Sequence, residues 1–139
     1  MKVINESLEF STSGFSDMKD LTSGVSRILS QSRLENGIVT LFVPGSTGGV
    51  TTIEFEPGLQ KDFPELMEKL IPQKKSYHHD ATWGDDNGFS HLRASLIGPS
   101  LTIPFSHSRL TLGTWQQIVF VDFDNRSRSR TLTLQFMGE

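Results

Sequence analysis

Hydrophobic positions divide the first third of the chain into two segments with different periods. Partial alternation of apolar and polar residues over residues 3–10, followed by Ser11-Thr12-Ser13-Gly14, predicts an edge strand. Ser16 suits a helix N-cap, and the apolar residues after it recur at helical spacing, which predicts an amphipathic helix ending before Asn36-Gly37. These apolar residues are Met18, Leu21, Val25, Ile28 and Leu29.

The remaining pattern is dominated by short strands. Residues 37–43 are β-branched and almost continuously apolar, which is typical of a central strand covered on both faces. Residues 50–55 predict another strand. After Pro57-Gly58 a weakly helical stretch is expected, whose second part is a helix over residues 64–71 starting at Pro64, and residues 72–88 predict a long loop. Beyond the loop, an antiparallel meander is expected at residues 92–97, 100–105, 109–112, 116–123 and 129–137. Strands outnumber helices, so the pattern predicts a single α+β domain over residues 1–139.

Composition and charge narrow the function classes. The chain has 139 residues, a formal net charge of -3 and no cysteine, which excludes disulfides, thiolate nucleophiles and Cys-based zinc sites. The sequence pI of about 5.8 lacks the basic excess of a nucleic-acid-binding domain, so no nucleic-acid partner is expected. No apolar run is long enough for a signal peptide or a membrane span, so we expect a cytoplasmic protein without a membrane partner.

The four histidines are concentrated in one part of the chain and are its most informative feature. His78, His79, His91 and His107 lie within 30 residues, together with Asp80 and the sequence Asp85-Asp86-Asn87. Imidazoles and carboxylates are the ligands expected for a divalent metal in a protein without thiols, and they also transfer protons. The alternative is a set of exposed loop histidines and turn-forming Asp and Asn residues. If His78 and His79 are extended, only one of them can face His91.

Three further groups could bind an anion or transfer a proton. The loop Pro44-Gly45-Ser46-Thr47-Gly48-Gly49 could present backbone N–H groups and hydroxyls to a phosphate, although its residues also suit a tight turn. Glu54 could ligate a metal or transfer a proton, and Arg109 could bind a phosphate through two parallel hydrogen bonds. Surface roles would explain both residues equally well. Arg126, Arg128 and Arg130 alternate with serines, so the three cations would line one face of an extended segment. They could make only a weak phosphate contact, and a solvated hairpin is the favoured interpretation.

Three ordered blocks of sequence resemble the YjbQ-like family, whose members are described as uncharacterised or as secondary thiamine-phosphate synthases. The blocks are 45–54 (GSTGGVTTIE), Tyr77-His78-His79 through Asp85-Asp86-Asn87 to His91-Leu92, and 109–116 (RLTLGTWQ). The resemblance spans nearly the whole chain. It departs at Gly45, where many relatives carry His, so Ser46 or Thr47 would have to act there through a hydroxyl.

The resemblance implies an α+β domain with a large mixed, mainly antiparallel sheet and two to three helices, assembled as a homotrimer. It implies a transferase that joins a pyrimidine-methyl pyrophosphate to a thiazole phosphate with the help of a divalent metal (Zn, Mg or Mn) and no organic cofactor. The catalytic residues carried over are His79, His91, Asp86 and Glu54; those for substrate binding are Ser46, Thr47, Asn87, Arg109 and Gln116; those for metal are His79, His91 and Asp86.

Two other functions are consistent with the same residues. A non-catalytic trimeric protein could bind a metal or a small phosphorylated ligand without converting it. Alternatively, the trimer could be a scaffold whose polar residues line a seam between subunits. Substitution of His79 or His91 distinguishes the scaffold from the other two hypotheses. An enzyme or a binding protein should lose ligand binding while the trimer stays intact, whereas a scaffold should lose its assembly.

Overall fold

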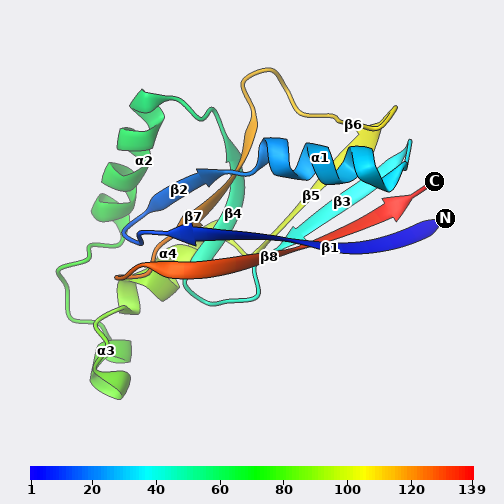
Figure 1. The fold of residues 1–139 in the computed structure, drawn as a ribbon. Coiled ribbons are helices and arrows are strands. Elements are labelled where there is room, and N and C mark those ends of the chain that lie inside the picture. Colours follow the sequence, from blue (N-terminus) through cyan, green and yellow to red (C-terminus); the bar gives the residue numbers. More distant parts are fainter.

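Two antiparallel sheets form the framework of the molecule (Figure 1). The computed structural model describes residues 1–139. The five-stranded sheet has the order β1-β8-β3-β5-β6, and the three-stranded sheet has the order β2-β7-β4. The strands are β1 (Lys2–Thr12), β2 (Asp17–Asp20), β3 (Gly37–Phe42), β4 (Gly48–Ile53), β5 (Ser100–Ser106), β6 (Arg109–Leu110), β7 (Gln117–Asp122) and β8 (Arg128–Gly138).

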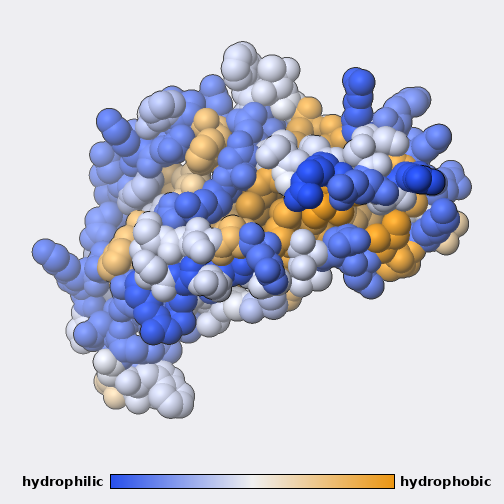
Figure 2. Space-filling view, in the orientation of Figure 1, coloured by the Kyte–Doolittle hydropathy of each residue, from blue (hydrophilic) through white to orange (hydrophobic).

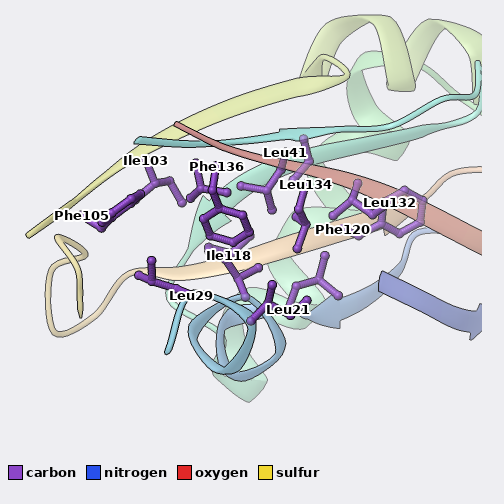
Figure 3. Close-up of a cluster of buried hydrophobic side chains, with 14 of the residues drawn as sticks. Leu21, Leu29, Leu41, Ile103, Phe105, Ile118, Phe120, Leu132, Leu134 and Phe136 are labelled. Atoms are coloured by element: carbon purple, nitrogen blue, oxygen red, sulfur yellow. The ribbon is translucent and has the colours of Figure 1, made fainter. Parts of the chain in front are cut away.

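The main core lies between the two sheets and the first helix, α1 (Thr22–Ser32). Alternate residues of β8 point inward, so that Leu132, Leu134 and Phe136 are buried while their neighbours are exposed. Figure 3 shows these side chains meeting Ile118 and Phe120 of β7, with Leu29 of α1 and Leu21, just before that helix, on the other side. The strict period of two along β8 therefore sets which face of the sheet packs against β7 and α1.

A second, smaller core covers the opposite face of the three-stranded sheet. Val119, Val121 and Phe123 pack there, together with Met67 of α2 (Pro57–Leu70) and Ala94 of α4 (Gly88–Ile97). Glycines on β4 permit close packing on both of its sides. A Cβ on Gly49 would lie 2.9 Å from the Ile97 side chain on α4, and one on Gly48 would overlap the Phe120 ring. The sequence Gly48-Gly49 therefore lets α4 and the core approach the strand that follows the candidate loop.

The first helix starts later than predicted, whereas the second extends the predicted one toward the N-terminus. The predicted helix starting at Ser16 is wrong over its first residues, because residues 17–20 pair with β7 as strand β2. The helix begins after Leu21, and the Asp20 carboxylate accepts a hydrogen bond from the Thr22 N–H at 3.0 Å. The weakly helical stretch expected after Pro57-Gly58 forms one helix, α2, which runs through Pro64 and begins at Pro57 because the Glu56 carboxylate caps the N–H groups of Gly58 and Leu59.

The region around the histidines is also more helical than its pattern predicts. Part of the expected loop forms the short helix α3 (His78–Trp83), and the expected strand at residues 92–97 belongs to α4. The buried side of α4 includes Ser90 and Arg93, and these polar residues obscure the helical period of its apolar positions. Arg93 is buried because its guanidinium donates to the Ile71 carbonyl and to Glu68 at the end of α2.

The α+β class is confirmed, while the details of the architecture differ from the expectation. The strands divide between two sheets, the helices number four, and β7 leaves the expected meander to pair with β2 and β4. The central strand β3 is covered on one face, since Ile38 and Phe42 on its other face are exposed. Figure 2 shows hydrophobic residues along the middle of one face of the molecule and mainly hydrophilic residues around α2. None of the four helices combines the length and apolar character needed to cross a membrane.

Candidate functional site

Two histidines meet where α3 and α4 come together. The rings of His79 and His91 lie 4.3 Å apart between centroids, at an angle of 49°. The Asp80 carboxylate joins the starts of the two helices, because it accepts the Tyr77 N–H at 3.2 Å and the Gly88 N–H at 2.9 Å. Therefore the predicted convergence of His79 and His91 occurs, whereas the neighbouring His78 side chain is exposed.

The buried amide of Asn87 fixes the orientation of the His79 ring. With its Nδ2 toward the pair, Asn87 donates to His79 Nε2 at 3.0 Å and to the Asp85 carboxylate at 3.0 and 3.2 Å. In the opposite orientation, Oδ1 accepts a hydrogen bond from His79 Nε2 at 3.0 Å, and Nδ2 donates to Asp124 Oδ1 at 3.4 Å. In either orientation the Asn87 amide lies within hydrogen-bond distance of His79 Nε2 and so fixes the ring.

Two buried carboxylates at the end of β7 anchor the loop between β3 and β4. Asp122 accepts a bidentate interaction from Arg130, with Nε–Oδ2 and Nη2–Oδ1 distances of 2.7 and 2.8 Å. Asp124 accepts Arg128 Nε at 2.8 Å and the Thr47 hydroxyl at 3.1 Å. Arg130 Nη2 also donates to the Thr47 oxygen at 2.9 Å. Each carboxylate thus pairs with one arginine. The Thr47 hydroxyl is hydrogen-bonded to both Asp124 and Arg130, and these bonds hold the loop in place.

The environment of His91 and Asp124 shifts both groups from their ordinary behaviour. Burial lowers the pKa of His91, and the neighbouring His79 lowers it further, against a smaller opposing effect of Asp85 and Asp124. Burial alone would raise the pKa of Asp124, but hydrogen bonds from the Asn125 N–H, Arg128 and Asn87 outweigh it and lower the pKa. At neutral pH the site therefore contains a neutral His91 imidazole and an ionised Asp124 carboxylate.

The candidate loop and His91 line one hollow of about 150 Å³. Ser46 supplies the loop hydroxyl that faces no partner within the chain, while Ser95 supplies a second hydroxyl from α4. The residues that line the hollow are Gly45, Ser46, Gly48, His91, Ala94, Ser95 and Pro99. The structure therefore brings together the loop and one of the two paired histidines, as expected for a small polar ligand site.

Other predicted site residues lie elsewhere. Asp85 is the acidic residue beside His79, at 3.5 Å from Nε2, whereas Asp86 is exposed in a left-handed conformation with φ 55°. Arg109 and Gln116 line a different hollow of about 340 Å³, beside α1. Glu54 is exposed just after β4. No group of three His, Asp or Glu side chains is arranged to hold a metal ion, so the predicted set of His79, His91 and Asp86 is not assembled within one chain.

The buried charge pairs were not anticipated from the sequence. The solvated-hairpin interpretation is wrong for Arg128 and Arg130, which pair with carboxylates that are 0% exposed. A usable signal was present, because Asp122 and Asp124 precede Arg128 and Arg130 with the same spacing of two residues. Charges of opposite sign spaced in this way on either side of a short turn can pair with one another.

Comparisons with known proteins agree with this geometry. The family model described as UPF0047 protein YjbQ-like matches residues 6–139. A UPF0047 protein of Methanothermobacter thermautotrophicus is 37% identical over 139 residues, covering 100% of this chain and 95% of that protein. The crystal structure of a YbjQ-like protein of unknown function from Sulfolobus solfataricus P2 has a TM-score of 0.94 at 31% identity and covers 99% of both chains. A hypothetical protein from Aeropyrum pernix K1 gives a TM-score of 0.91 at 34% identity, covering 98% of this chain and 99% of that one. The chain therefore belongs to the UPF0047 (YjbQ-like) family, whose function is not established.

Proposed function

We propose that the protein is an enzyme that acts on a small phosphorylated substrate in the hollow beside His91. The observation that carries the proposal is the contact between His79 and His91, with ring centroids 4.3 Å apart, at the loop that contains Ser46. Two imidazoles in contact, one of them with a lowered pKa, suit general acid–base chemistry. Beside them, a loop with a free hydroxyl offers a place for a phosphate group.

His91 is the proposed proton acceptor. Its pKa is lowered first by burial and then by His79, so the ring is neutral and basic at neutral pH. His79 is the proposed partner in proton transfer, since its ring is oriented by Asn87 and lies 3.5 Å from Asp85. In this proposal Asp85 takes the place of Asp86, because Asp85 is the aspartate that lies beside His79.

The family resemblance supports a specific reaction for this site. In a thiamine-phosphate synthase-like transfer, the thiazole nitrogen forms a bond to the pyrimidine methylene carbon while the bond from that carbon to the pyrophosphate oxygen breaks. Both electrons of the broken bond leave with pyrophosphate, so the largest requirement is stabilisation of the leaving anion. N–H and O–H donors of the loop would serve that need. His79 would donate a proton to the departing oxygen, and His91 would take up a proton from solvent and pass it to His79, so that the pair is restored.

No step of this proposal passes through a metal ion. One chain supplies two neighbouring imidazoles but no group of three His, Asp or Glu side chains that could hold a metal. Elemental analysis of the protein purified without added metal tests for a divalent ion directly. One metal per chain, lost together with activity in His79→Ala and His91→Ala, would require metal ligands in the mechanism.

We propose that a homotrimer completes the site. Arg109 and Gln116 line a separate hollow within the chain, and an adjacent copy could supply them to the histidines. The outer face of the five-stranded sheet is uncovered and carries Ile38 and Phe42, which are 38% and 44% exposed. Light scattering gives the number of subunits. Mixing inactive His91→Ala and Arg109→Ala proteins restores part of the activity only if the two residues act across a subunit boundary.

The central experiment compares single histidine variants. His79→Ala and His91→Ala should each abolish turnover of a pyrimidine-methyl pyrophosphate with a thiazole phosphate, or of related phosphorylated substrates, while the circular dichroism spectrum is retained. His78→Ala is the matched control, because His78 is on the same helix as His79 but its side chain is exposed. Full activity of both test variants would refute the proposed role of the pair.

The same experiment separates the enzyme from a non-catalytic binding protein. The observation that favours a binding protein concerns the loop hydroxyls. The Thr47 hydroxyl is hydrogen-bonded to Asp124 and Arg130, so Ser46 supplies the loop hydroxyl that can contact a ligand. Tight binding of a phosphorylated compound by the wild-type protein, without conversion of any substrate tested, would support the binding function instead.

A further inference from the structure

Arg130 has an unused pair of hydrogen-bond donors beside the candidate loop. A guanidinium has five N–H groups, and the Asp122 fork and the Thr47 hydroxyl use those on Nε and Nη2. Nη1 donates no hydrogen bond within the chain, yet it remains accessible, because Ser90 Oγ is the only fully buried side-chain polar atom without a partner. These two donors are therefore available to a ligand.

Arg130 Nη1 lies beside Gly45, at the start of the loop. A Cβ on Gly45 would lie 3.5 Å from Arg130 Nη1 and within 4 Å of no other atom beyond its chain neighbours. Gly45 also lines the hollow that contains His91. The missing side chain therefore leaves room beside Gly45 into which the guanidinium reaches.

The loop contributes further donors that have no partner within the chain. The backbone N–H groups of Ser46 and Thr47 make no hydrogen bond within the protein, unlike the Gly45 N–H, which donates to the Val43 carbonyl at 2.9 Å. The Ser46 hydroxyl is also unpaired, and Ser46 is exposed. Consecutive unpaired N–H groups in a turn form a concave site that favours anions.

The guanidinium is held in place before any ligand arrives. It is tied to Asp122 by two hydrogen bonds, and its Cζ lies 5.7 Å from the centroid of the Phe120 ring. Its side chain is only 15% exposed. A donor held rigidly in this way loses little conformational entropy when it binds an anion.

We propose that Arg130 Nη1, the Ser46 hydroxyl and the backbone N–H groups of Ser46 and Thr47 bind the phosphate group of the substrate in the space beside Gly45. The proposal rests on the proposed function and assigns its phosphate site to Arg130 rather than to Arg109. Asp122 and Asp124 are each paired with an arginine, so neither buried carboxylate adds an uncompensated negative charge beside the proposed site. Exposed Glu9 also borders Arg130, and it would disfavour the most highly charged anions.

The test measures binding of inorganic phosphate to the full-length protein by isothermal titration calorimetry, without turnover. Gly45→Ala places a methyl group in the proposed site without requiring a left-handed backbone, and Arg130→Lys removes Nη1 but keeps a cation beside Asp122. Each variant should weaken phosphate binding about tenfold or more, as expected for the loss of a hydrogen bond to a charged group. The matched control is Arg126→Ala, which removes an exposed arginine outside the site and should stay within about twofold of the wild type.

Three results would overturn the proposal. They are no saturable phosphate binding by the wild type at about 10 mM, wild-type affinity in folded Gly45→Ala, and loss of binding in Arg109→Ala alone. The proposed function fails in a different way. If phosphate affinity follows the pattern above but no substrate is converted, the anion site stands and the enzyme proposal falls. If His91→Ala abolishes turnover while Gly45→Ala binds phosphate normally, the reverse holds.

Discussion

Asp124→Asn probes the buried charge pair that holds the loop and Asn87 together. The carboxylate is 0% exposed and accepts Arg128, the Thr47 hydroxyl and the Asn125 N–H. Breaking a buried pair by removing one partner costs roughly 3–5 kcal/mol. Arg128 is 32% exposed, so water partly compensates it, and an asparagine keeps some of the acceptor bonds. We therefore expect a loss of about 2–3 kcal/mol at pH 7.

The sign of the pH dependence follows from the lowered pKa of Asp124. A carboxylate whose pKa is lower in the folded state stabilises the fold above its unfolded pKa, and this contribution disappears as the pH falls through the folded pKa. The difference between wild type and Asp124→Asn should therefore be full at neutral pH and should shrink below about pH 4.

Urea unfolding at a series of pH values measures this difference. In a domain of this size the expected loss corresponds to a decrease in Tm of roughly 6–15 °C at neutral pH. Glu65→Gln is the matched control, because Glu65 is an exposed carboxylate on α2 and should change stability by less than about 0.5 kcal/mol. A loss below this limit in Asp124→Asn, or a loss that does not depend on pH, would show that the pair contributes no net electrostatic stabilisation.

Three further predictions concern the site and its supports. His79→Ala should raise the pKa of His91 by removing a neighbouring positive charge, as followed by NMR titration of the ring; an unchanged or lower pKa would contradict the contact. Gly48→Ala should destabilise the protein by about 1–3 kcal/mol in chemical unfolding, because its Cβ overlaps the Phe120 ring, and a neutral result would mean that the ring moves aside freely. Ser90→Ala should be neutral or stabilising by up to about 1 kcal/mol in the same assay, since Ser90 Oγ is buried without a partner; a clear loss of stability would reveal a hydrogen bond to that oxygen.

Local sequence patterns were sufficient where one side of a strand faces the core. The alternation over residues 129–137 predicted β8, and the apolar run at 37–43 predicted β3. The local pattern predicted a strand at residues 92–97, where the structure has α4. Arg93 is buried there because it donates hydrogen bonds to the end of α2, and such a tertiary contact leaves no local signal in the sequence. The pattern also failed at the start of α1, since residues 17–20 extend only because β7 is available to pair with them.

In the candidate site too, local sequence predicted some features and tertiary contacts decided the others. The concentration of histidines correctly predicted that His79 and His91 meet. The residue types alone could not show which of Asp85 and Asp86 lies beside His79. Their positions depend on the left-handed backbone conformation of Asp86. Residue type also favoured Arg109 as the anion-binding group, because the partners of Arg130 lie in another strand and a loop.

The sequence by itself determined the α+β class, the hydrophobic faces of the strands and the kinds of side chain available for chemistry. It did so because burial patterns with periods of 2 and 3.6 are local properties of the chain. Only the tertiary structure decided which of those side chains meet. The positions of His91, Asp124 and Arg130 relative to the loop after β3 depend on the path of the chain between two sheets, and no local pattern encodes that path.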